Sequence, residues 1–240
     1  MQRVHKVNAD VIPYTLFKRI DRFNLLYYNS PMSDMNKIYA QVPPGYYFES
    51  LRNNILQRFW HEQRFKQIRQ LCSNRTGTLL DIGCADGVFT NVIYNAMSAK
   101  SKITGIDIYK PSITFAHKKY PYIRFMVAAG EKIPFPKASF NYITCLEMLE
   151  HVASPSLLLN EMRRILKKNG TIIIMVPHET WLFKFIWFIW TKSKGKVWDH
   201  AHLQHFDRSS MTTLFTKNNF KIIYHKTFLL NMLMLFEITP

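Results

Sequence analysis

The stretch Leu79-Leu80-Asp81-Ile82-Gly83-Cys84-Ala85-Asp86-Gly87-Val88-Phe89-Thr90 decides the fold of this chain. Apolar β-forming residues lead into a glycine-rich turn, and residues compatible with a helix follow. Thr104-Gly105-Ile106-Asp107 then ends a second apolar strand in a carboxylate, 20 residues after Gly87. A strand, a glycine-rich turn, a helix and a strand ending in a carboxylate are typical of a nucleoside-binding βαβ unit.

The acidic residue at the end of the first strand narrows the kind of ligand. Dinucleotide sites of the form G-x-G-x-x-G bind a pyrophosphate at the helix N-terminus. Here Asp81 comes before Gly83, Ala85 and Gly87, and its carboxylate would repel a pyrophosphate. A ligand with an ammonium or sulfonium group fits this charge better. The alternative is an ordinary strand-turn-helix segment that binds no ligand.

Composition limits the class of protein. The chain has 240 residues, of which 48% are hydrophobic, enough for one α/β domain with additions. Cys72, Cys84 and Cys145 show no CxxC spacing, which favours a reducing compartment over a disulfide scaffold or a zinc site. We expect no signal peptide in the polar segment 1–21 and no membrane span, and therefore a cytoplasmic location.

The net charge of +16 is the most unusual bulk property. Such an excess is typical of proteins that meet nucleic acid, an anionic membrane surface or an acidic substrate. The basic residues are spread along the chain without a block of five or six in a row. A lysine-rich solvated surface therefore explains the charge as well as any polyanionic partner does.

The pattern of apolar residues predicts alternating strands and helices, which indicates an α/β fold with a parallel sheet and helices on both faces. We expect residues 1–76 to form an N-terminal helical cap and residues 77–240 to form the main domain, with an aromatic insertion near 179–206. Turns are expected at 27–31 and 42–47. A helix capped by Ser50 should run to Cys72, and Lys167–Gly170 should end another helix. The expected strands are 78–82, 102–107, 122–127, 140–145, 170–176, 220–226 and 228–236, and the expected helices are 50–72, 87–98, 111–119, 155–168 and 208–218.

Two further segments follow the third and fourth expected strands. They read Ala128-Ala129-Gly130-Glu131-Lys132-Ile133-Pro134-Phe135-Pro136 and Cys145-Leu146-Glu147-Met148-Leu149-Glu150-His151-Val152. Together with the glycine-rich turn, in this order and spacing, they resemble the motifs of class I S-adenosylmethionine-dependent methyltransferases. The resemblance runs from about Thr78 to Pro177. The departures are Ala85, where the family more often has glycine, and Ala129, where it has aspartate.

This resemblance implies a Rossmann-like, seven-stranded, mostly parallel sheet whose last strand is antiparallel, and S-adenosyl-L-methionine as the cofactor. It also implies a role for particular residues. The glycine-rich turn would hold the methionine end, the end of the second strand would hold the ribose, backbone of the third loop would meet the adenine, and backbone after the fourth strand would line the methyl path. In that order the implied cofactor-binding residues are Asp81, Gly83, Ala85 and Gly87; Asp107 and Ile108; Gly130 and Glu131; and Cys145 and Leu146.

His151 is the candidate catalytic residue, because a neutral imidazole beside the methyl path can take the proton of a hydroxyl acceptor. A histidine that caps the following loop is the equally weighted alternative. In quinone-type O-methyltransferases, which the Glu147–His151 run resembles, such residues are linked to a divalent metal. Because Glu147 and Glu150 lie at i, i+3, helix capping is simpler, and we assign no metal ligand. His200, His202 and His205 are expected to form a pocket wall.

The segment Glu179-Thr180-Trp181-Leu182-Phe183-Lys184-Phe185-Ile186-Trp187-Phe188-Ile189-Trp190 is apolar around nearly its whole circumference and is followed by Lys192, Lys194 and Lys196. Tryptophan beside lysine is typical of a membrane interface, and about ten residues cannot span a bilayer. A lid helix packed on the domain is the alternative. Both interpretations predict a hydrophobic acceptor.

We therefore expect methyl transfer to a small or lipid-like acceptor, most simply on oxygen, with a possible anionic membrane surface as a partner through Trp181–Trp190 and the following lysines. An RNA or tRNA methyltransferase is the first rival, motivated by the charge. The chain lacks the Asn/Asp-Pro-Pro-Tyr/Phe motif of base-modifying amino methyltransferases and a Pro-Cys nucleophile pair. A non-catalytic binding module of the same fold is the second rival.

Overall fold

The computed structural model describes residues 42–192 and 202–240. These residues belong to one compact unit. The turn expected at 27–31, together with Lys194, Lys196 and His200, also lies outside the described residues.

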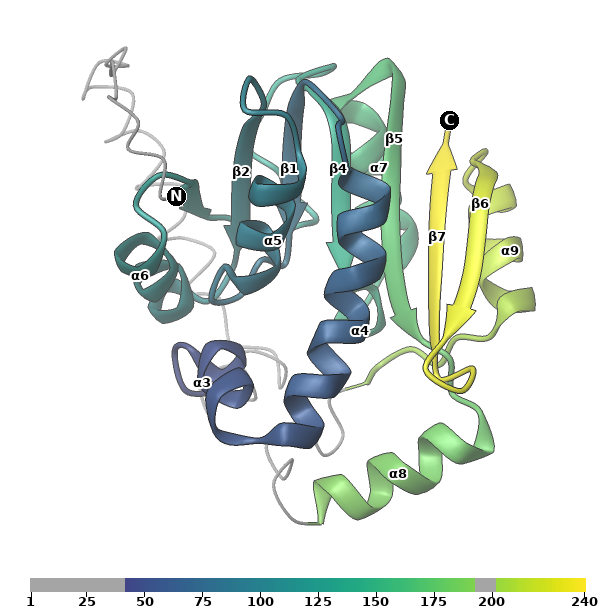
Figure 1. Cartoon of the computed structure of the whole chain (residues 1–240). Helices are drawn as coiled ribbons and strands as arrows, with labels where there is room; N and C mark the ends of the chain where they lie inside the picture. The colour runs from purple at the N-terminus through teal and green to yellow at the C-terminus, as the bar shows by residue number, and fades with distance from the viewer. Residues whose placement is uncertain (1–41, 193–201) are drawn as a thin grey trace. The chain divides into compact units, whose positions relative to one another are not determined.

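One seven-stranded sheet forms the centre of the described unit, in the order β3-β2-β1-β4-β5-β7-β6 (Figure 1). The first five strands of this order are parallel, and β7 pairs antiparallel with both β5 and β6. The strands are β1 (Thr78–Ile82), β2 (Lys102–Asp107), β3 (Arg124–Val127), β4 (Phe140–Leu146), β5 (Leu166–Pro177), β6 (Lys221–Phe228) and β7 (Leu233–Thr239). The expected Rossmann-like sheet with an antiparallel last strand is confirmed.

The order of the strands locates the site. The chain moves outward from β1 to β2 and β3, and then returns to the other side of β1 to form β4. In open α/β sheets, ligands bind beyond the carboxyl ends of the strands at such a reversal. A ligand is therefore expected beyond the edge of the sheet formed by the ends of three strands: β1 at Ile82, β2 at Asp107 and β4 at Leu146.

Helices cover both faces of the sheet. The helices are α3 (Tyr46–Asn53), α4 (Ile55–Cys72), α5 (Val88–Ala96), α6 (Lys110–Lys119), α7 (Pro155–Ile165), α8 (Trp181–Thr191) and α9 (Arg208–Lys217), with a 3-10 turn, η1, at Leu149–His151. One apolar core joins α4, α5 and α6 to the sheet, and a second core joins α7 and α9 to the opposite face. Burial of these two apolar faces is the main stabilising term.

Two element boundaries differ from the sequence-based expectation. The helix expected at 50–72 is broken at Asn54, whose extended backbone and side chain cap α4 by accepting from the amides of Leu56 and Gln57. Ser50 is therefore not a helix cap; it lies inside α3. The helix expected to end at Lys167–Gly170 ends at Ile165, because Leu166 already pairs with Phe140 of β4.

The C-terminal hairpin also shifts relative to the expectation. The strand expected at 228–236 begins at Leu233, and the preceding strand extends to Phe228. Between them Leu229, Leu230 and Asn231 all have positive φ, between 51° and 64°. Three consecutive left-handed residues cannot continue a strand, so they turn the chain back along the end of β5.

Candidate functional site

A pocket lies at the carboxyl ends of β1, β2 and β4, where the reversal of strand order places it. It is lined by the turn after β1, the start of the segment after β2, the residues after β4, and α3 with the chain before it. The lining residues are Val42, Pro43, Tyr46, Tyr47, Gly83, Ala85, Asp86, Asp107, Tyr109, Ser112, Glu147, Met148 and His151. Of the residues implied by the sequence, the structure brings together Gly83, Ala85, Asp107 and His151.

Asp107 is held in place by backbone amides. The amide of Ala85 donates to Oδ2 at 2.9 Å, and the amide of Tyr109 donates to Oδ1 at 2.8 Å. Burial raises the pKa of Asp107, while these backbone hydrogen bonds oppose the rise. Each carboxylate oxygen retains capacity to accept another donor, and the implied ribose contact of Asp107 stays a prediction.

Gly83 and Gly87 are required in the turn for different structural reasons. Gly83 lines the pocket with φ +75°, and an added Cβ would lie 2.6 Å from Cγ of Met148. Gly87 begins α5 with φ +80°, and an added Cβ would lie 2.8 Å from the Phe125 ring, away from the pocket-lining set. Ala85 takes a positive φ of 45° without being glycine. The turn thus needs left-handed backbone for its shape and small residues for close packing.

The structure directs Asp81 into the protein rather than into the pocket wall. Its two oxygens accept from the hydroxyls of Thr90 and Thr144, both at 2.7 Å, and the side chain is buried. Burial raises the pKa of Asp81 to about 6, against the opposing effect of the two hydroxyls. Asp81 therefore links β1 to β4 and α5, and its implied contact with the methionine end stays a prediction.

The remaining implied residues do not line the pocket. Cys145 and Leu146 are buried in β4, one or two residues before the lining pair Glu147 and Met148. Gly130 packs against Leu158 and Met148. Ile108 and Glu131 are partly buried and are likewise not among the lining residues. Their implied cofactor contacts remain predictions.

Residues before β1 complete the pocket, and the sequence analysis missed them. Val42, Pro43, Tyr46 and Tyr47 line it, and the amide of Phe48 donates to Oδ2 of Asp86 at 2.9 Å. The only sequence signal was the run of proline and tyrosine at 42–47, which was interpreted as a turn. Its place over the glycine-rich loop follows from tertiary packing.

His151 lines the pocket from η1 and lies close to further ionisable groups. Its ring centroid is 5.3 Å from that of His202, whose Nδ1 is 3.1 Å from Oε1 of Glu179. Glu179 also lies 2.6 Å from Nδ1 of His205. The His202 ring also contacts the Trp187 ring of α8, and the two ring centroids are 4.6 Å apart. The expected pocket-wall role of the histidine turn agrees with this proximity for His202 and stays a prediction.

The side chains that could hold a metal differ from the set Glu147, Glu150 and His151 considered from the sequence. Ligand atoms of Glu150, His151 and His202 lie within 4.8 Å of one another. Glu147 instead forms an ion pair with Arg64 of α4. The candidate set thus contains His202 in place of Glu147, and the expectation of no metal ligand stays a prediction.

A Rossmann-like sheet with β7 between β5 and β6, and a glycine-rich turn whose Ala85 amide donates to the carboxylate at the end of β2, are the architecture of a class I S-adenosylmethionine-dependent methyltransferase. The chain belongs to the family described as methyltransferase domain, whose model matches residues 31–225. The cofactor of this class is S-adenosylmethionine.

Three relatives illustrate the family. The demethylmenaquinone methyltransferase of Chlorobaculum tepidum is 27% identical over 60% of this chain and 60% of its own length. The ubiquinone/menaquinone biosynthesis C-methyltransferase of Rickettsia bellii is 28% identical over 61% and 62%, and the ubiquinone biosynthesis O-methyltransferase of Hydrogenovibrio crunogenus is 25% identical over 60% and 60%. The chain thus spans about three fifths of the length of these relatives.

Among solved structures, the fold is similar to that of a putative methyltransferase from Haloferax volcanii in complex with the Trm112 methyltransferase activator. The TM-score is 0.67 at 15% identity, over 88% of this chain and 99% of that one. At this identity the likeness shows the fold alone.

Proposed function

We propose that this chain transfers a methyl group from S-adenosylmethionine to a lipid-like acceptor with an aromatic hydroxyl, of the quinol type. The observation that carries the proposal is the pocket in which His151 shares a wall with Asp107 and Gly83. The names of the three relatives, all quinone-biosynthesis methyltransferases, support this acceptor class.

The pocket residues suit the cofactor. Asp107 offers an oriented carboxylate for the ribose hydroxyls, and Gly83 and Ala85 leave room for backbone approach. Asp86 adds a carboxylate to the same wall, which fits a ligand bearing a sulfonium and an ammonium. When bound, S-adenosylmethionine supplies an activated methyl group, so the protein contributes mainly proximity and orientation.

We infer that His151 accepts the proton of the acceptor hydroxyl, and we propose oxygen as the methylated atom. Glu147 is less suited to this role, because its carboxylate is paired with the Arg64 guanidinium. Methylation at carbon is the second candidate, favoured by the C-methyltransferase name of the Rickettsia bellii relative. The same histidine serves both reactions, since loss of the phenolic proton also activates the ring carbon beside it.

The proposal is tested by calorimetry with S-adenosylmethionine and by methyl transfer from labelled cofactor to water-soluble hydroquinones. We expect binding that Asp107→Ala weakens at least about tenfold. Asp207→Ala, at the start of α9 and outside the pocket, is the matched control. The position of the label in the product separates oxygen from carbon methylation.

The same assays separate the rivals. Absence of cofactor binding would make the chain a non-catalytic binding module. Tight, steeply salt-dependent RNA binding with methyl incorporation into RNA would favour the nucleic-acid enzyme.

We also propose that an anionic membrane surface is a partner, reached through Trp181–Trp190 and the lysines that follow. Trp181, Phe185 and Phe188 are 80%, 58% and 60% exposed, which supports this contact. Within residues 42–192 and 202–240, no helix is long and apolar enough to cross a bilayer.

A further inference from the structure

Large apolar side chains are exposed on three segments that are far apart in the sequence. They lie on the first turn of α4, along α8, and in the turn between β6 and β7. The residues and their exposed fractions are Ile55 83%, Leu56 80% and Phe59 57%; Trp181 80%, Phe185 58%, Ile186 42%, Phe188 60% and Ile189 53%; and Leu230 79%. Contiguous exposed apolar surface of this kind marks an interaction site.

The hydrogen bonds place two of these segments together. The amide of His178, three residues before α8, donates to the carbonyl of Met232, and His178 Nδ1 lies 3.0 Å from the carbonyl of Asn231. Leu233 pairs with Pro177, the last residue of β5. The β6–β7 turn and the start of α8 are therefore neighbours at the carboxyl end of β5.

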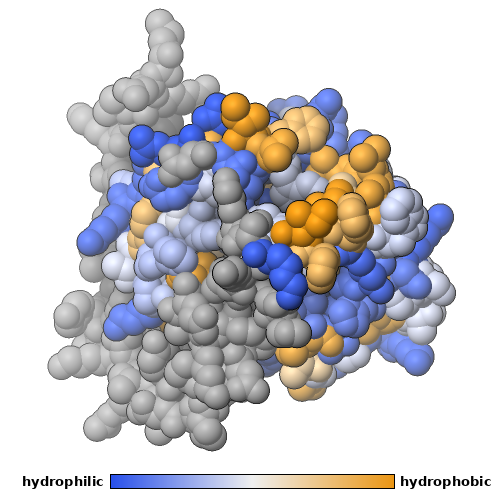
Figure 2. All heavy atoms as spheres, turned by 90° about the horizontal axis from the view of Figure 1, so that it is seen from below, coloured by the Kyte–Doolittle hydropathy of each residue, from blue (hydrophilic) through white to orange (hydrophobic). Residues whose placement is uncertain are grey.

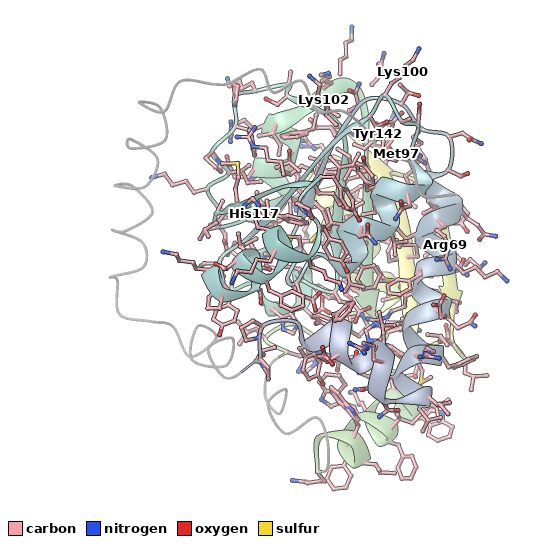
Figure 3. The ribbon with its side chains drawn as sticks, turned by 60° about the vertical axis from the view of Figure 1, so that its left-hand side comes forward. Arg69, Met97, Lys100, Lys102, His117 and Tyr142 are labelled. Carbon is pink, nitrogen blue, oxygen red and sulfur yellow. The ribbon has the colours of Figure 1, made fainter. Side chains whose placement is uncertain are left out.

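The first turn of α4 reaches the same end of the unit. Arg64 of α4 contacts Glu147, which follows β4 at the pocket. Ile55 lies nine residues earlier, about 13 Å further along the helix. Figures 1 and 3 both show the beginning of α4 beside α8 at the lower end of the unit. Figure 2 views this end from below and shows hydrophobic groups among hydrophilic ones.

The charge of the three segments indicates the partner. Arg58, Lys184 and Lys192 are exposed on them, and residues 55–59, 181–192 and 229–231 contain no Asp or Glu. Apolar side chains with flanking cations and no carboxylates match an anionic lipid surface, where the rings enter the headgroup region and the cations meet phosphate. Lys100 and Lys102 lie at the opposite end of the unit (Figure 3), so cations alone do not define this surface.

This surface borders the pocket. Trp187 of α8 contacts the His202 ring, which contacts His151 of the pocket wall. A lipid-like acceptor held in a bilayer would thus meet the protein at the side that carries the candidate catalytic histidine.

We propose that the first turn of α4, α8 and the β6–β7 turn form one membrane-binding face, which presents the pocket to an anionic bilayer. The inference rests on the proposed function for the identity of the acceptor and for the membrane contact of α8. It extends the contact from α8 to two further segments, each of which contributes to binding.

The experiment is sedimentation of the full chain with phosphatidylglycerol/phosphatidylcholine vesicles and with pure phosphatidylcholine vesicles, without cofactor or acceptor. We expect binding to the anionic vesicles only. Ile55→Ser, Phe185→Ser and Leu230→Ser, one in each segment, should each lower partitioning at least about threefold. Ile223→Ser is the matched control, because Ile223 is 54% exposed and lies near the start of β6, far from the turn.

Quenching of tryptophan fluorescence by brominated lipid gives a measurement on the unaltered protein. The proposed face is supported if brominated lipid quenches the fluorescence and if Trp181→Phe reduces this quenching. The proposed face is overturned if the unaltered protein does not bind anionic vesicles. It is also overturned if Ile223→Ser lowers partitioning as much as the other variants do, or if only Phe185→Ser lowers it. A concentration-dependent dimer abolished by the same substitutions would also overturn it, since a second copy would then cover the face. Cofactor calorimetry on the same samples reports separately on the proposed function.

Discussion

Arg64 of α4 forms a partly buried ion pair with Glu147, the pocket-lining residue that directly follows β4. The Arg64 side chain is only 3% exposed, and its second terminal nitrogen contacts Nδ1 of His61. Burial and the guanidinium lower the pKa of His61 to about 2, so this imidazole stays neutral. The helical segment before β1 is thereby fixed to the catalytic edge of the sheet.

Breaking this pair should destabilise the fold. In Arg64→Met the Glu147 carboxylate loses its partner, and we expect a loss of about 3 kcal/mol in the free energy of unfolding, measured by urea titration. The double variant Arg64→Met/Glu147→Gln should recover part of the loss. Arg69→Met, which removes an exposed pair with Glu62 on the same helix, should cost less than about 1 kcal/mol. Strictly additive losses would contradict the coupling.

Substitution of Gly83 should act through Met148. In Gly83→Ala the new Cβ would meet the Met148 side chain, and the positive φ adds about 1–2 kcal/mol of strain. We expect a lower melting temperature and weaker S-adenosylmethionine binding. Adding Met148→Ala removes the 2.6 Å contact with Cγ but keeps the Cβ contact at 2.9 Å and the backbone strain, so it should restore affinity and stability only in part. Unchanged affinity in the single variant would argue against Gly83 as part of the cofactor wall.

The buried Asp81 makes stability depend on pH. Its pKa is raised from 3.8 to about 6 in the folded protein, so folding favours the protonated form. This contribution is fully present below pH 4 and is lost as the pH rises through about 6, by up to about 3 kcal/mol. Asp81→Asn should therefore reduce the change of the unfolding free energy between pH 4.5 and 7 in calorimetric melts, and part of the change should remain because burial also raises the pKa of Asp86 to about 6. An identical pH dependence in both proteins would exclude Asp81 as the source.

Removal of the His151 imidazole should affect turnover rather than binding. We expect His151→Gln to lower kcat by about 10²- to 10⁴-fold, with S-adenosylmethionine affinity within about twofold of the unaltered protein. His117→Gln, on the exposed face of α6 (Figure 3), is the control. A loss confined to KM, with kcat unchanged, would mean that His151 binds the acceptor without taking its proton.

The sequence alone determined the class and the central geometry. Apolar strands that alternate with helices, the glycine-rich turn and Asp107 after the second strand are local patterns. They predicted a nucleoside-binding unit in a parallel sheet, and the family resemblance implied its Rossmann-like form. Gly83, Ala85, Asp107 and His151 line one pocket because parallel strands bring their carboxyl ends to one edge.

Only the tertiary structure decided which side chains face that pocket. Asp81 is adjacent to the turn in sequence, yet two threonine hydroxyls hold it inside the sheet layer. Tyr47 and Arg64 carry no local signal, because their place follows from how α3 and α4 pack against strands many residues away. Ile55, Phe185 and Leu230 are exposed on three segments that lie at the same end of the unit for the same reason. Their placement depends on long-range strand pairing and helix direction, which no short pattern encodes.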